Sequence, residues 1–166
     1  MEKTLVDLQD FVKTIAEKYG DRDVYRYIVD GNVVNKSFKT FERDINSVAS
    51  WFVEKGWEGR HIAIIGSSSY YWMTTFLGVA CSGNVVIPID RMLPDSEILN
   101  LLVLGDVDAV FVSEEFERLM PAISAADNQV KKIVRFAGIT YQNILMTKHR
   151  QLPSIDPDGL TEILFT

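Results

Sequence analysis

The sequence predicts an α/β fold: a doubly wound, largely parallel sheet with flanking helices, preceded by an N-terminal helix and a β-hairpin. Short, continuous apolar runs such as His61–Ile65 and Val85–Ile89 alternate with amphipathic segments, which is typical of buried parallel strands joined by helices. The 166 residues suit one domain, and 47% of them are hydrophobic, enough to form a core. A charged fraction of 24% argues against disorder.

The first expected elements are a helix and a hairpin. Apolar residues recur on one face of Thr4–Tyr19, its first residue can cap it, and Gly20 lies where helices often stop. The β-branched and aromatic runs Val24–Val29 and Val33–Phe38 flank Asp30-Gly31-Asn32, which predicts a tight turn between two antiparallel strands.

The rest of the chain is expected to alternate between helices and strands. A helix begins at Thr40 and ends at Gly56. The strands predicted after it are His61–Ile65, Val85–Ile89, Ala109–Val112, Ile133–Phe136 and Ile163–Phe165. The helices predicted between them are Tyr70–Cys81, Pro94–Leu104, a helix capped by Ser113 that runs to Met120 and is kinked or restarted at Pro121, and a short one around Tyr141–Thr147.

Composition excludes several classes of partner. Seventeen Lys and Arg against 23 Asp and Glu give a net charge of −6, which argues against nucleic acid. A single cysteine, Cys81, forms no internal disulfide, and with only two histidines no metal site is expected. The start does not resemble a signal peptide, and the longest apolar stretch, Leu77–Ile89, is too interrupted to span a membrane. We therefore expect a cytoplasmic protein.

Ligands of open parallel sheets bind at the carboxyl ends of the strands, so ligand-binding residues are expected in the turns that follow them. Gly66-Ser67-Ser68-Ser69 could hold an anion at a helix start, although it matches neither glycine-rich nucleotide fingerprint, and serines here more often cap the helix. Asp90-Arg91 follows the next strand and could contact a ligand or form an ordinary surface pair.

Other polar groups have ordinary structural interpretations. The acids of the turns around Asp106 and Pro157 are typical local caps, His149 is expected in solvent, and Cys81 ends an apolar helix face. His61 begins a strand and has no obvious acid or nucleophile as a partner. The basic cluster Lys131, Lys132 and Arg135 is too small for nucleic acid, and the aromatic run Tyr70-Tyr71-Trp72 is more typical of a core than of a stacking platform. Taken residue by residue, the chain shows no catalytic constellation.

Four stretches together resemble a known family. The third is the most specific, because Leu-Gly-x-x-x-x-Gly is followed by an apolar strand that ends in Pro-x-Asp. The stretches are Ser37–Phe41 with its helix to Gly56, Arg60–Trp72, Leu77–Asp90 with Leu93-Pro94, and Asp158–Thr166. They are similar to the N-terminal part of adenylate-forming (AMP-binding) enzymes. Within this family the third stretch resembles the motif of long- and medium-chain acyl-CoA synthetases, because Asn84 and Arg91 differ from the residues of the peptide-synthetase motif.

The resemblance implies a function for a longer protein. Such an enzyme activates a carboxylic (fatty) acid with ATP and Mg²⁺, releases pyrophosphate and passes the acyl group to coenzyme A. Thr166 would be the first residue of the loop that holds the ATP phosphates, so residues 1–166 are expected to be an N-terminal subdomain truncated there. Asp90 and Arg91 are the candidates near coenzyme A, and no catalytic residue or metal ligand is assigned.

Three expectations follow from this interpretation. The chain alone should be inactive and bind none of these cofactors tightly, because it lacks a phosphate cradle and a cation for the leaving charge. Apolar surface left uncovered by truncation favours a homodimer.

Two other classes of function stay open: a stand-alone, non-catalytic α/β module that binds a partner or nucleotide, and a small nucleotide-binding protein that uses Gly66–Ser69.

Overall fold

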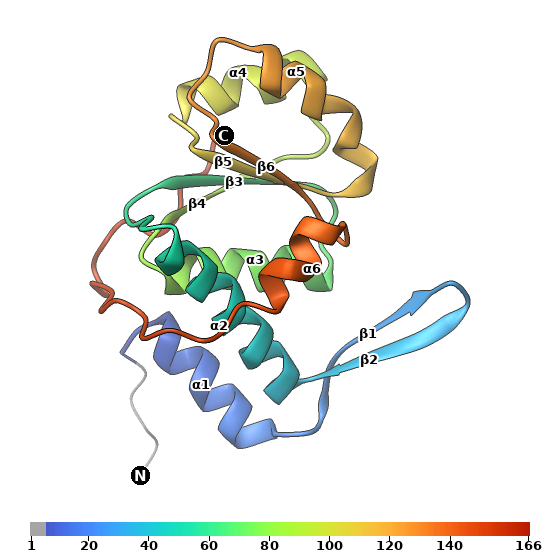
Figure 1. Cartoon of the computed structure of the whole chain (residues 1–166), viewed down its shortest axis with the longest axis vertical. Helices are drawn as coiled ribbons and strands as arrows, with labels where there is room; N and C mark the ends of the chain where they lie inside the picture. The colour runs from blue at the N-terminus through green and yellow to red at the C-terminus, as the bar shows by residue number, and fades with distance from the viewer. Residues whose placement is uncertain (1–5) are drawn as a thin grey trace.

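A parallel sheet lies at the centre of the computed structural model, which describes residues 6–166 (Figure 1). Its four strands lie in the order β4-β3-β5-β6, and every neighbouring pair is parallel. Their bounds are β3 His61–Ile65, β4 Val85–Ile89, β5 Ala109–Val112 and β6 Lys132–Arg135. The predicted α/β class and the positions of these four strands are confirmed, with β6 one residue earlier than expected.

Helices cover both faces of the sheet, as a doubly wound fold requires (Figure 1). Ile62 and Ile64 of β3 face the cluster that holds α2, α3 and α6, while Ala63 and Ile65 face α4 and α5. This alternation follows from the two-residue period of a strand, and all four side chains are fully buried. The helices are α1 Leu8–Tyr19, α2 Phe38–Glu54, α3 Tyr70–Cys81, α4 Asp95–Leu104, α5 Met120–Ala125 and α6 Ile139–Leu145. None of these helices combines the length and the apolarity needed to cross a bilayer.

Side-chain caps set three helix starts. Ser37 accepts a hydrogen bond from the amide of Thr40 at 3.2 Å, and Ser69 accepts one from Trp72 at 3.1 Å. The first helix begins later than predicted: Asp7 is its cap, accepting from the Asp10 amide at 2.8 Å, while the expected cap Thr4 lies outside the described residues.

The hairpin forms a sheet of its own. Its strands, β1 Asp23–Val29 and β2 Asn32–Ser37, pair antiparallel with each other and with no strand of the central sheet. Asp30 and Gly31 both have positive φ angles, 48° and 77°, as the twist of a two-residue hairpin loop requires. The predicted hairpin is confirmed, and Figure 1 shows it projecting from the body of the molecule.

The segment after β5 is less regular than predicted. Glu114–Leu119 is a 3-10 helix, η1, and a regular α-helix begins only at Met120. Pro121 lies in the first turn of that α-helix, where its missing N–H is no loss. The predicted helix after Ser113 and its restart at this proline are therefore confirmed, whereas the side-chain cap predicted at Ser113 is wrong.

The predicted strand Ile163–Phe165 is also wrong. The segment makes a single parallel bridge to the sheet, between Glu162 and Val86. Val86 donates to the Thr161 carbonyl at 2.9 Å and accepts from the Ile163 amide at 2.9 Å. The next donor on this edge would be residue 88, which is proline, so the ladder stops. Ile163 and Phe165 instead pack against the apolar cluster around α4.

Gly78 explains how closely two helices approach under the sheet. A Cβ atom at this position of α3 would lie 2.5 Å from Val48 Cγ1 and 3.2 Å from the Ile45 carbonyl oxygen, both on α2. Only glycine leaves room for this packing. The glycine of the Leu-Gly motif is thus a helix-packing residue.

Candidate functional site

The carboxyl ends of the parallel strands all lie at the same end of the sheet, which is called the carboxyl edge below. The predicted site residues lie along this carboxyl edge. Asp90 and Arg91 directly follow β4, and both are exposed. Asp90 Oδ1 accepts a hydrogen bond from the Met92 amide at 2.9 Å, which fixes the turn and leaves its other oxygen free of that bond. Asp90 thus has the local turn role that a strand-end acid usually has, and Arg91 faces solvent.

The loop after β3 already binds a carboxylate of this chain. Glu115, on η1, accepts hydrogen bonds from the Ser67 amide at 3.1 Å and the Ser67 hydroxyl at 2.8 Å. These bonds lower the pKa of Glu115, and the charge of nearby Arg91 adds to the effect. The turns after β3, β4 and β5 are therefore linked, and an incoming anion would have to displace Glu115 from Ser67.

Glycine is required where this loop leaves the sheet. Gly66 has a φ angle of 147°, and a Cβ atom there would overlap the side chain of Ser113 at the end of β5. Ser69, further along the loop, is used as the cap of α3. Both features support the expected structural role of Gly66–Ser69. They argue against the alternative interpretation, in which the chain is a small nucleotide-binding protein that binds its ligand through this loop.

Thr166 lies at the end of a segment that runs in the same direction as β4. The bridge between Glu162 and Val86 is parallel, so the last residues lead toward the edge that carries Asp90 and Arg91. Thr166 itself is exposed. The three residues singled out for ligands thus come from neighbouring segments of the fold.

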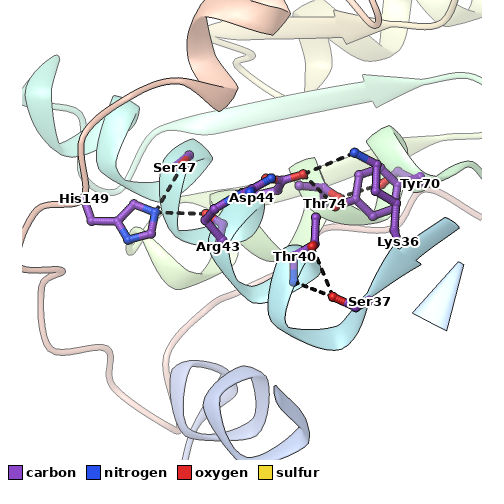
Figure 2. A network of polar contacts seen from close by, with 9 residues as sticks. All are labelled: Lys36, Ser37, Thr40, Arg43, Asp44, Ser47, Tyr70, Thr74 and His149. Atoms are coloured by element: carbon purple, nitrogen blue, oxygen red, sulfur yellow. Dashed lines mark hydrogen bonds and ion pairs between the residues drawn. The ribbon is translucent and has the colours of Figure 1, made fainter. Parts of the chain in front are cut away.

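A buried ionic cluster was missed by the sequence reasoning. Asp44 on α2 is 1% exposed, and its carboxylate accepts from the Tyr70 hydroxyl at 2.7 Å and from Arg43 Nη2 at 2.7 Å (Figure 2). Lys36 Nζ lies 3.9 Å from the same carboxylate. The only signal in the sequence is an acid within the apolar stripe that begins at Phe41.

His149 is joined to the same helix. Its Nε2 lies 3.0 Å from the Arg43 carbonyl oxygen and 3.2 Å from Ser47 Oγ (Figure 2). A carbonyl only accepts, so Nε2 carries the proton in this contact. The exposure predicted for His149 is confirmed, but the ring also ties the segment after α6 to α2.

The remaining candidates have structural roles. Asp108 is buried at the amino edge, where it accepts from the His61 amide at 3.2 Å and pairs with Lys131 at 2.9 Å. Burial raises the pKa of the Cys81 thiol to about 12, so it is no thiolate nucleophile near neutral pH. Within residues 6–166 no three His, Cys, Asp or Glu side chains are grouped to hold a metal ion.

A cavity lies at the opposite, amino end of the sheet. It has a volume of about 600 Å³ between the start of α1 and the loop 154–161. Phe11 and Leu160 are among the side chains that line it, with Glu58 and the Gly83-Asn84 turn before β4. It is therefore separate from the strand-end residues described above.

Comparison with known proteins identifies the family. A family model described as AMP-binding enzyme matches residues 12–166. A D-alanine–D-alanyl carrier protein ligase of Streptococcus pyogenes is 20% identical over 137 residues, which is 82% of this chain and 26% of that protein. The chain therefore spans about a quarter of the length of this curated relative.

Two solved structures share the fold. A fatty acyl CoA synthetase of Mycobacterium tuberculosis superposes with a TM-score of 0.80 at 17% identity, over 99% of this chain and 33% of that one. The A-PCP didomain of a carboxylic acid reductase from Segniliparus rugosus gives a TM-score of 0.84 at 13% identity, over 99% and 30%. With the family model matching nearly the whole length, this chain belongs to the AMP-binding enzyme family.

Proposed function

We propose that this chain is the N-terminal part of an ATP-dependent enzyme that adenylates a carboxylic acid and then forms a thioester with coenzyme A. The match of the AMP-binding family model to residues 12–166 carries this proposal. The amino-acid sequence of Leu77–Asp90 favours a long- or medium-chain acyl-CoA synthetase that acts on fatty acids. The single buried cysteine, Cys81, suits a reducing compartment and hence the cytoplasm.

The proposed reaction has two steps. A carboxylate oxygen of the acid attacks the α-phosphate of ATP and pyrophosphate leaves; the thiol of coenzyme A then attacks the acyl carbon and AMP leaves. The first step needs a cradle and cations for the charge on the leaving group. In our proposal Thr166 begins that cradle, Mg²⁺ is held elsewhere in the longer enzyme, and residues 1–166 alone do not catalyse the reaction.

Asp90 and Arg91 are proposed to lie near the nucleotide of coenzyme A. Their exposure at the carboxyl edge supports this, since a guanidinium there is free to approach a phosphate. The positive charge of Arg91 also helps to lower the pKa of Glu115, which places a cation near the turns at this end of the sheet.

We further propose that the apolar surface beside α4 supports a homodimer when the chain is alone. Val103 and Leu104 are 52% and 70% exposed, and Leu164 is 62% exposed. The terminal segment lies against the end of α4, because Phe165 is 3.4 Å from the position of a Cβ atom on Gly105. A monodisperse monomer by light scattering at high concentration would contradict this proposal.

The test of the proposed function begins with the gene. We expect the reading frame to continue past codon 166 into a Ser/Thr/Gly-rich loop that contains a lysine. A stop codon at this position would contradict the proposed role of Thr166 and favour the stand-alone module. Pyrophosphate exchange then compares the activity of residues 1–166 with that of the longer enzyme.

A further inference from the structure

The hairpin β1–β2 is attached to the body through few contacts. It pairs with no strand of the central sheet, and Ile28 and Val33 are 71% and 62% exposed. Backbone bonds at its base join Phe38 to Arg22 at 3.1 Å and Lys39 to Gly20 at 3.1 Å. Beyond these, Val24, Tyr25 and Tyr27 of β1 pack on the cluster between α1, α2 and α3, where Tyr25 lies 5.8 Å from the Phe41 ring, and the remaining contacts are to Tyr70 and Asp44.

Tyr70 is the common contact of the hairpin side chains. The rings of Tyr25 and Tyr27, both on β1, lie 5.4 and 6.1 Å from its ring. Lys36, on β2, places its Nζ 5.0 Å above the same ring. Tyr70 is only 3% exposed and donates its hydroxyl proton to Asp44, so its position depends on that carboxylate.

Asp44 joins three elements through one charge. Its Oδ2 binds Tyr70 of α3 and faces Lys36 of β2, while its Oδ1 is held by Arg43 of its own helix (Figure 2). A carboxylate buried to this degree is stable only while it is paired and hydrogen-bonded. Without its charge, Lys36 loses its counter-ion and the attraction that draws β2 onto α2 disappears.

We propose that Asp44 is an electrostatic latch for the hairpin: its buried charge keeps β1–β2 docked on α2 and α3, and when that charge is removed the hairpin releases as a unit while the parallel sheet stays folded. The sheet has its own clusters on both faces, none of which contains a hairpin residue. The hairpin is packed only against the cluster between α1, α2 and α3. Two cooperative units of different stability are the physical basis of local opening.

Hydrogen exchange tests the latch because a released two-stranded hairpin is marginal in water and exchanges its amides. In Asp44→Asn, amides of β1 and β2 should exchange at least tenfold faster than in wild type, while those of β3 and β5 stay within about threefold. Arg43→Gln is the matched control. Arg43 is a partner of the same carboxylate, but it is 61% exposed and belongs to α2 rather than to the hairpin. Hairpin exchange should therefore change less than twofold.

Two results would overturn the proposal: equal acceleration in the hairpin and in β3 and β5, or no acceleration in the hairpin. Should Asp44→Asn fail to fold, Lys36→Met removes the hairpin side of the latch from a side chain that is 22% exposed. Hairpin exchange should then rise about threefold or more with the sheet unaffected, and an unchanged hairpin would refute the latch. In a folded Asp44→Asn chain, adding Lys36→Met should change hairpin exchange by less than twofold.

Discussion

Replacing Gly78 with alanine should destabilise the chain, although alanine is the better helix former. The helix-propensity gain of Gly→Ala in α3 is about 1 kcal/mol. Against it, the new methyl group would lie 2.5 Å from Val48 Cγ1, 2.6 Å from Val48 Cβ and 3.2 Å from the Ile45 carbonyl oxygen. The last two atoms belong to or adjoin the backbone of α2, so a side-chain rotation cannot relieve the overlap.

Overpacking of this kind costs about 1–3 kcal/mol, and contacts this short place Gly78→Ala at or beyond the upper end of that range. After the propensity gain is subtracted, we expect a net loss of about 2 kcal/mol, or a fall in Tm of roughly 4–8 °C for a chain of this size. Circular dichroism melts and urea titrations measure both quantities.

A compensating substitution tests the reasoning itself. Val48→Gly removes both close atoms, whereas Val48→Ala leaves the Cβ atom at 2.6 Å. The cost of Gly78→Ala should therefore be smaller by at least about 1 kcal/mol in the Val48→Gly background than in wild type. An unchanged or higher Tm for Gly78→Ala, or additive effects in the double variant, would refute the close approach of α2 and α3 at this position.

Three further predictions concern individual side chains. Ser67→Ala should raise the pKa of Glu115 toward its ordinary value, because the hydroxyl bond that stabilises the carboxylate is lost; an NMR titration that shows no rise would contradict this. Because folding lowers the pKa of Glu115, its ionised carboxylate contributes a small amount of stability at pH values above the pKa of the unfolded chain. This contribution disappears as the pH falls through the pKa of the folded chain, and Ser67→Ala should reduce its size. Burial raises the pKa of the Cys81 thiol to about 12, so at pH 8 the thiol should react with a disulfide reagent only as fast as the chain unfolds, and rapidly in urea. A fast reaction in buffer without urea would show that the thiol is accessible and contradict this prediction. In the longer enzyme, Arg91→Ala should raise the KM for coenzyme A about tenfold with kcat little changed, and an unaltered KM would remove Arg91 from the coenzyme A site.

The sequence predicted the sheet well because β3, β4 and β5 are short apolar runs that are almost fully buried, whereas β6, at the edge of the sheet, is only partly buried. Strand β3 is an example: its residues have no polar alternation, and they are followed by Gly66 and a serine cap. The secondary-structure prediction failed where a local sequence pattern favours a strand but a residue elsewhere in the fold prevents its pairing. Ile163–Phe165 has strand composition, but its neighbour on the sheet is Pro88, which lacks the required N–H. That neighbour is known only once the topology is known.

The site was predicted less completely, since its contacts join residues far apart in the chain. Asp90 and Arg91 could be proposed from their place after a strand, and the structure does leave them exposed at that edge. Glu115, which occupies the loop at Ser67, lies 48 residues away from it and follows a different strand. Asp44 is an acid whose role depends on Tyr70 and Lys36, and helical periodicity alone predicts no such pair.

Pyrophosphate exchange tests most directly the claim that this chain is the acid-activating enzyme's N-terminal part and not a complete catalyst. Residues 1–166 and the protein encoded by the full reading frame are each incubated with ATP, Mg²⁺, labelled pyrophosphate and a series of fatty acids. We predict acid-dependent exchange into ATP by the full protein and none above background by residues 1–166. Exchange catalysed by residues 1–166, or a full protein that shows no exchange with any carboxylic acid, would contradict the proposed function.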